Sequence, residues 1–187
     1  MRELTVRIRF TCHSLGNVRK HYSDQGRKRS YYVMPRNPSN RRVMFMPRWW
    51  TATLKRAAEI LCRHHAEVEE IRFSPEIEGE TRPVPAGLFT RYAGDRNHSR
   101  HEVFAPGDVI SVTCVVPSKI SDEDFLQLLR YAGKYCGISP AHSNNFGFYE
   151  VVSIRPTTPE AMREIETEGP PPGRATAAVS ELAEKSE

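Results

Sequence analysis

Apolar and polar residues alternate near the start of the chain. The apolar positions are Leu4, Val6, Ile8 and Phe10, and polar residues separate them. A period of two is typical of a β-strand with one buried face, so this segment predicts the first strand. Four later segments also predict strands: a short one over 42–46, one over 68–73 that reaches Ile77, one over 109–115, and a last one from Phe148 to Ile154.

Two other segments carry apolar residues at helical spacing. The first follows Pro47, and its apolar positions are Trp49, Leu54, Ala57, Ala58 and Leu61. We expect this helix to end near His65. The second follows Ser121, whose hydroxyl suits an N-cap, and three acidic residues then stand where the helix dipole is positive. Gly137 is the predicted left-handed C-cap of this helix.

The order of these elements predicts the class of fold. Strand, helix, strand, strand, helix and strand suggest an α+β domain of the ferredoxin-like (RNA-recognition-motif-like) class, with an antiparallel sheet and two helices on one face. Residues 17–42 show no lasting periodicity, so we expect a long basic loop after the first strand.

The end of the chain differs in composition from the rest. From Pro156 onward it carries seven acidic and three basic residues, a Gly-Pro-Pro-Pro-Gly run and almost no large apolar side chain. Such a segment cannot bury enough surface to offset the entropy of ordering. We therefore expect a ferredoxin-like domain over 1–155 and a disordered acidic tail over 156–187. Because the whole chain has a net charge of +4, residues 1–155 carry +8.

Cysteine usage and hydropathy exclude several classes of protein. The four cysteines are far apart and form no CxxC pair, which indicates reduced thiols and neither a metal site nor a disulfide framework. No apolar run approaches the roughly 20 residues of a membrane span. We expect a soluble, cytoplasmic protein with no membrane contact, and no motif predicts a cofactor.

Positive charge is concentrated between residues 17 and 48. Nine basic residues stand there against the single acid Asp24, with tyrosines between them. Cations and aromatic rings together are what a single-stranded nucleic acid requires of its binding surface. The alternative is a solvated loop whose charges only confer solubility. The candidate residues of this segment are Arg19, Lys20, Tyr22, Arg27, Lys28, Arg29, Tyr31, Arg36, Arg41, Arg42 and Arg48.

Two short motifs resemble a known family. The run MPRWWTATLKRAA at 46–58 and the run GISPAHSNNFGFYEV at 137–151 are similar to the helix start and the glycine-rich loop of the repeat-associated mysterious protein superfamily, found in CRISPR effector complexes. The resemblance covers roughly 4–154. Tryptophans stand at 49 and 50 where small residues are usual, and His142 and Asn144 stand where arginine is usual.

The resemblance implies an RNA-binding protein within a ribonucleoprotein complex, with other protein subunits as partners. It also implies contact of the 137–147 loop with an RNA backbone, through Gly137, His142, Asn144 and Gly147. A backbone N–H can approach phosphate closely where no Cβ intervenes. The other interpretation is a tight connection in which the two glycines only satisfy turn geometry.

Two further functions stay open at this stage. A scaffold subunit without affinity for nucleic acid would use the sheet edge and the tail. Some members of the resembling superfamily cut RNA without metal through a histidine, and His21, next to Lys20 and Tyr22, is the one candidate for that role. We expect His98 and His101 to lie in an exposed loop. Our interpretation favours binding over catalysis.

Overall fold

The first and last predicted strands and their neighbours form a four-stranded sheet. The computed structural model describes residues 1–24, 26–61, 65–79, 84–89, 99–138 and 146–157, so the predicted tail lies outside the described residues from 158 onward. The sheet has the order β5 (Arg72–Gly79), β8 (Val109–Val116), β1 (Arg2–Phe10) and β9 (Tyr149–Pro156). All its neighbouring strands are antiparallel.

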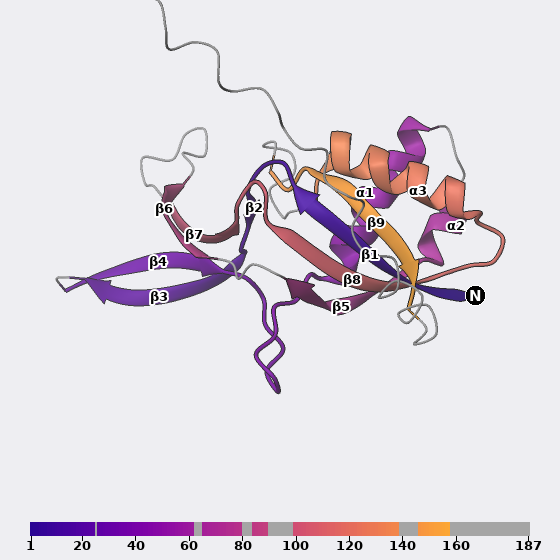
Figure 1. The fold of residues 1–187 in the computed structure, drawn as a ribbon. Coiled ribbons are helices and arrows are strands. Elements are labelled where there is room, and N and C mark those ends of the chain that lie inside the picture. Colours follow the sequence, from indigo (N-terminus) through magenta and orange to yellow (C-terminus); the bar gives the residue numbers. More distant parts are fainter. Residues whose placement is uncertain (25, 62–64, 80–83, 90–98, 139–145, 158–187) are drawn as a thin grey trace, which may run out of the picture. The chain divides into compact units, whose positions relative to one another are not determined.

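Two helices connect these strands and cover one face of the sheet (Figure 1). They are α1 (Pro47–Ile60), between β1 and β5, and α3 (Asp122–Tyr131), between β8 and β9. A five-residue helix, α2 (His65–Glu69), follows α1. The order βαββαβ and the antiparallel pairing confirm the ferredoxin-like prediction. Among the described residues, no helix has the length and apolarity that a membrane crossing requires.

The buried face of the sheet follows the alternation in the sequence. Leu4, Val6, Ile8 and Phe10 are each 5% exposed or less, and the polar residues between them are more exposed. From α1, Trp49 and Trp50 are both buried, and the Trp50 ring stacks on that of Phe73, with 4.4 Å between centroids. The core therefore lies between the helices and the sheet.

Three predicted boundaries were wrong. Helix α1 ends at Ile60 and not near His65, and Val68 belongs to α2 and not to a strand. Val68 is 4% exposed, so its apolar side chain fills the core from a helix. Residues 42–46 form no strand: Val43 and Met44 make isolated bridges to Arg36 and Glu76, and Phe45 donates its N–H to the Pro75 carbonyl over 2.8 Å. In the same part of β5, its pairing with β8 shifts register between Phe73 and Ile77.

The helix ends match the capping rules in part. Ser121 Oγ accepts the Asp124 N–H over 3.1 Å, which confirms the predicted N-cap. After α3 the chain makes a π-helical turn, η1 (Ala132–Cys136), and the Gly137 N–H bonds to the Ala132 carbonyl over 2.9 Å. Gly137 has the expected positive φ, 69°, but its ψ of 153° lies outside the left-handed helical region.

The predicted basic loop is a strand pair over most of its length. Strands β3 (Val18–Asp24) and β4 (Arg27–Val33) form an antiparallel hairpin, and Gly26 has a positive φ of 74° in its turn. The loop prediction was therefore wrong for 18–33. Both faces of this hairpin carry polar residues, so the hydrophobic alternation that reveals a half-buried strand is missing.

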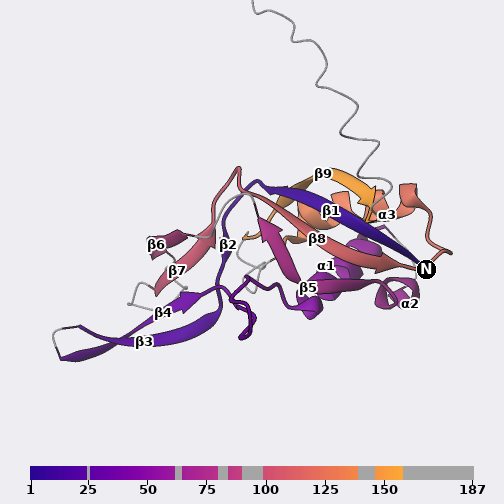
Figure 2. The ribbon, with the colours of Figure 1, turned by 60° about the horizontal axis from the view of Figure 1, so that its bottom comes forward.

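The hairpin belongs to a second sheet. Its order is β2 (Ser14–Leu15), β7 (Ser99–Phe104), β4 and β3, and β6 (Val84–Phe89) also pairs with β7. This sheet combines two insertions into the ferredoxin-like core, one between β1 and α1 and one between β5 and β8. Both views show β3 and β4 extending away from the four-stranded sheet (Figure 1, Figure 2).

Removing the Trp50 ring should test the packing of α1. We expect Trp50→Ala to lower the free energy of unfolding by about 3–5 kcal/mol, because it empties a fully buried site. Trp50→Phe should cost clearly less, since a ring remains and the buried indole N–H, which has no partner among the described residues, is removed. Urea unfolding measures both. Equal losses for the two variants would contradict the packing described here.

Candidate nucleic-acid interface

The hairpin register brings cationic and aromatic positions together. In three of the seven cross-strand pairs a basic residue stands opposite a tyrosine: Arg19 with Tyr32, Lys20 with Tyr31, and Arg29 with Tyr22. Arg19, Lys20 and His21 are exposed, and Tyr31 and Tyr32 are half-buried. Because directly opposite residues of an antiparallel pair share a face, the register places charge beside aromatic surface.

The hairpin is attached to the rest of the protein at one end, its root, which comprises Val18 and residues 31–33. Among the described residues, strand β4 pairs in parallel with β7 only through Tyr31 and Tyr32, opposite Arg100 and His101. From residue 19 to residue 30, the described backbone pairs only within the hairpin. The predicted candidates Arg27, Lys28 and Arg29 lie on this part of β4, next to the turn.

His101 forms one side of this root. It is 5% exposed, so our prediction that it lies in an exposed loop was wrong; His98 lies outside the described residues. Its ring stacks on Tyr32, with 4.7 Å between centroids and 11° between planes. Its Nδ1 lies 3.0 Å from the Gly16 carbonyl oxygen, and its Nε2 has no partner among the described residues. Burial lowers the pKa of His101, so the ring is neutral and donates from Nδ1.

Gly16 permits the close approach of two segments at the same place. A Cβ at this position would lie 2.4 Å from the carbonyl carbon of Val33, a distance that no side chain tolerates. The Gly16 N–H also donates to the Glu102 carbonyl over 2.8 Å. Strand β2, the end of β4 and strand β7 therefore meet at one point, and only glycine fits there.

Glu102 forms the other side of the root. Its carboxylate is 8% exposed and accepts the Met34 N–H over 2.7 Å and the Arg36 Nη1 over 2.9 Å, while Arg36 Nη2 bonds to its second oxygen. The hydrogen bond to Glu102 raises the pKa of Arg36. The guanidinium of Arg36 is thus bound to a carboxylate of the protein itself. Through this contact, the segment that follows β4 is linked to strand β7.

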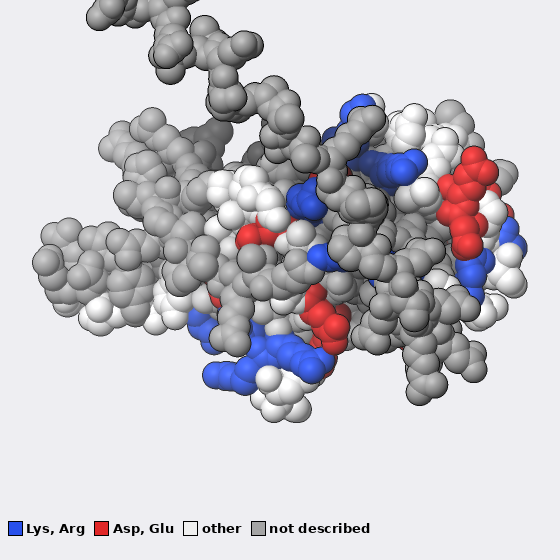
Figure 3. Space-filling model, in the orientation of Figure 1, with Lys and Arg blue, Asp and Glu red and all other residues white. Residues whose placement is uncertain are grey.

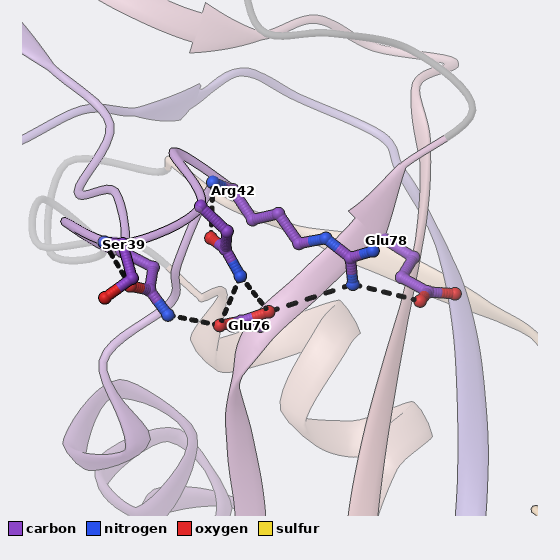
Figure 4. Close-up of polar contacts among 6 residues, drawn as sticks. Ser39, Arg42, Glu76 and Glu78 are labelled. Carbon is purple, nitrogen blue, oxygen red and sulfur yellow. Dashed lines mark hydrogen bonds and ion pairs between the residues drawn. The ribbon is translucent and has the colours of Figure 1, made fainter.

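The loop over 36–43 presents the next basic residues. Arg41 is exposed and has a positive φ of 63°, which is uncommon for a residue with a side chain. Arg42 lies between two carboxylates of β5, 3.8 Å from Glu76 and 3.6 Å from Glu78 (Figure 4). Lys and Arg side chains gather beside acidic ones in this region, at the bottom of the view in Figure 3.

Two asparagine side chains hold this loop against β5. Asn40 donates to both oxygens of Glu76 over 3.1 and 3.2 Å, and Asn37 donates to one of them (Figure 4). These hydrogen bonds, with the charge of Arg42, lower the pKa of Glu76. The loop conformation that exposes Arg41 therefore depends on Glu76.

The glycines of the 137–147 loop are buried, and their N–H groups have partners. Gly137 donates to Ala132, and Gly147, with φ 78°, donates to the His13 carbonyl over 2.8 Å. A Cβ on Gly137 would lie 2.5 Å from the Phe146 carbonyl oxygen. The two glycines close the base of the loop, whereas His142 and Asn144 lie outside the described residues.

The remaining candidates lie apart from the hairpin root. Arg48 is exposed in the first turn of α1, and His21 stands opposite Ser30 on the hairpin. Among the described residues, no group of His, Cys, Asp or Glu side chains has a metal-binding arrangement. Sequence reasoning missed Gly16 and Glu102 and misplaced His101, since their partners are distant in the chain and no local motif marks them.

Comparison with known proteins gives similarity in structure only. No protein-family model and no curated protein matches the chain. The fold is similar to that of a chain in Type III-B Cmr-beta bound to cognate target RNA, with a TM-score of 0.57 and 12% identity; the match covers 82% of this chain and 60% of that one. A chain of a Type IV-B CRISPR complex matches with a TM-score of 0.48, 10% identity and coverages of 98% and 95%. The first similarity supports the ferredoxin-like fold.

Burial of His101 predicts a dependence of stability on pH. Because its pKa is lowered in the folded protein, the unfolded chain takes up a proton below about pH 6.5 that the folded protein does not. The free energy of unfolding should therefore fall as the pH drops from 6.5, by at most about 1.4 kcal/mol per pH unit, and should not change through this group above 6.5.

His101→Gln provides the comparison, because it keeps a donor for the Gly16 carbonyl and does not titrate. Urea unfolding of both proteins at pH 7.5, 6.5 and 5.5 should give a smaller pH dependence for the variant. The other histidines are the same in both proteins. Identical pH dependence would show that His101 is not buried in its neutral form.

Proposed function

We propose that this chain is an RNA-binding or single-stranded nucleic-acid-binding subunit of a CRISPR-type ribonucleoprotein complex, related to the repeat-associated mysterious protein superfamily. The observation that carries the proposal is the cross-strand pairing of basic residues with tyrosines in the β3–β4 hairpin. The ferredoxin-like fold and its similarity to a chain of an RNA-bound Type III-B assembly support it.

The physical argument starts from what a single strand exposes. Its phosphates attract Lys and Arg and release bound counterions, and its unpaired bases stack on aromatic rings. In a two-stranded ribbon, a basic residue directly opposite a tyrosine lies on the same face as the tyrosine. Such a pair can bind a phosphate and stack on a base at one place. The exposed side chain of Lys20, opposite Tyr31, fits this use on one face of the ribbon. Arg19, opposite Tyr32, is exposed on the other face, where the Tyr32 ring also stacks on His101.

The predicted site residues take different roles in this proposal. Direct contact is assigned to the hairpin, to two exposed arginines outside it and to the second loop. These residues are Arg19, Lys20, Tyr22, Arg27, Lys28, Arg29, Tyr31, Arg41 and Arg48, with His142 and Asn144 in the second loop. Arg36 and Arg42 position the segment after the hairpin through Glu102 and Glu76. Gly137 and Gly147 shape the base of the second loop.

Protein subunits of the same complex are the proposed partners, and the cytoplasm is the proposed location. A scaffold role without nucleic acid is the main alternative. The two differ in their dependence on salt, because phosphate contacts weaken steeply as salt rises and an apolar protein contact does not.

Removing the charges next to the hairpin turn tests the proposal. Replacing Arg27, Lys28 and Arg29 together with Ala should weaken binding to a single-stranded RNA oligomer across sequences. The slope of log affinity against log salt should become shallower by about 2 if each residue contacts a phosphate of the single strand. Fluorescence anisotropy titrations at several salt concentrations give both quantities.

A matched control removes the same charge elsewhere. Lys55, Arg72 and Lys119 are on α1, on β5 and before α3, away from the hairpin, and their joint replacement with Ala changes the net charge equally. This variant should keep most of the affinity and the salt slope. If the hairpin variant binds as tightly as the unchanged protein at low salt, the nucleic-acid function is refuted and the scaffold role takes its place.

A further inference from the structure

Two tyrosines lie together where helix α3 ends. Tyr131 is the last residue of α3 and is half-buried against the core, and Tyr135 follows in η1 with 52% of its surface exposed. Their ring centroids are 5.5 Å apart, with 45° between the planes. The Lys134 Nζ lies over the Tyr135 ring, 5.1 Å from its centre. The exposed Tyr135 ring thus has the half-buried Tyr131 ring next to it and the Lys134 ammonium group over its face.

The backbone under Tyr135 is held in a defined shape. The π-helical turn is closed by the bond from the Gly137 N–H to the Ala132 carbonyl. Gly133 is buried against Tyr149, where a Cβ would lie 2.3 Å from the carbonyl oxygen. Single π-helical turns occur frequently at functional sites. Because the turn is fixed before any ligand binds, little entropy would be lost when the Tyr135 ring makes a contact.

Hydrogen bonds connect this turn to the root of the hairpin. The carbonyl after η1, that of Gly137, accepts from Thr53 Oγ1 over 2.8 Å, and the next one, that of Ile138, accepts from Ser14 Oγ over 3.1 Å. Ser14 belongs to β2 and stands two residues before Gly16, at the hairpin root. The turn and the root are therefore at the same end of the ferredoxin-like core.

The charge around Tyr135 favours an anionic ligand. Arg130 and Lys134 are both exposed, and the nearby acid Glu59 is bound to Arg56 over 2.7 Å. An apolar protein partner would leave these cations without counterions. A nucleotide matches both features, since its base stacks on a ring and its phosphate binds a cation.

We propose that Tyr135 is a stacking platform for one base of a single-stranded nucleic acid, and that Lys134 binds a neighbouring phosphate. Stacking of a base outweighs an exposed cation–π contact, so the ammonium group can leave the ring and turn to the phosphate. This proposal rests on the proposed function and adds a second contact to the hairpin. It also assigns a role to the exposed aromatic surface at the end of α3.

Three replacements of Tyr135 in the full chain separate stacking from other contacts. Tyr135→Ala should weaken binding to a single-stranded RNA oligomer about tenfold, with an unchanged salt slope. Tyr135→Phe keeps the ring and should bind within about twofold of the unchanged protein, whereas Tyr135→Leu should lose about as much as the Ala variant. Lys134→Ala should make the salt slope shallower by about 0.7, the value for one phosphate of a single strand.

An oligomer of the same length without bases is the matched control ligand. The unchanged protein and Tyr135→Ala should bind it equally, because no base is present to stack. If Tyr135→Ala binds RNA as well as the unchanged protein while the triple hairpin variant does not, the platform is refuted and the proposed function stands. Equal binding of the RNA by the Leu and Phe variants would also refute stacking, because an apolar side chain without a ring would then serve equally well. Failure of the unchanged protein to bind any single strand would refute both proposals.

Discussion

The carboxylate of Glu102 joins the two insertions of this fold. It lies on β7, in the insertion between β5 and β8, and it accepts hydrogen bonds from Met34 and Arg36, in the insertion between β1 and α1. A buried charge is costly unless it is paired and hydrogen-bonded, and here both conditions are met. The root of the hairpin, and with it the position of the proposed nucleic-acid interface, depends on this group.

The root combines several constraints of different kinds. His101 stacks on Tyr32 and binds the Gly16 carbonyl, and Gly16 leaves no room for a side chain against Val33. These contacts act on the base of the hairpin only, while the backbone from residue 19 to residue 30 pairs only within the hairpin among the described residues. A fixed base and a long polar ribbon are consistent with a segment that reaches toward a ligand outside the ferredoxin-like core.

The ferredoxin-like core could be predicted from the sequence because its burial is periodic. Leu4, Val6, Ile8 and Phe10 mark a strand at every second position, and Ser121 begins its helix with a hydrogen bond that its side chain predicts. The hairpin could not, because both of its faces are polar and no alternation marks its strands. His101 and Glu102 could not be assigned either, since their partners lie 66 to 85 positions away in the chain. Pro156 and Thr157, assigned to the tail from the sequence, instead continue the pairing with β1. The tail from 158 onward and the contacts of the candidate residues with nucleic acid stay predictions.

Photo-cross-linking tests most directly whether the hairpin contacts nucleic acid. A single-stranded RNA that carries 4-thiouridine throughout would be irradiated with the full chain, and mass spectrometry would locate the cross-linked peptides. The account predicts that cross-links concentrate in residues 18–33 and disappear as salt is raised. Cross-links confined to other parts of the chain, with none in 18–33, would contradict it.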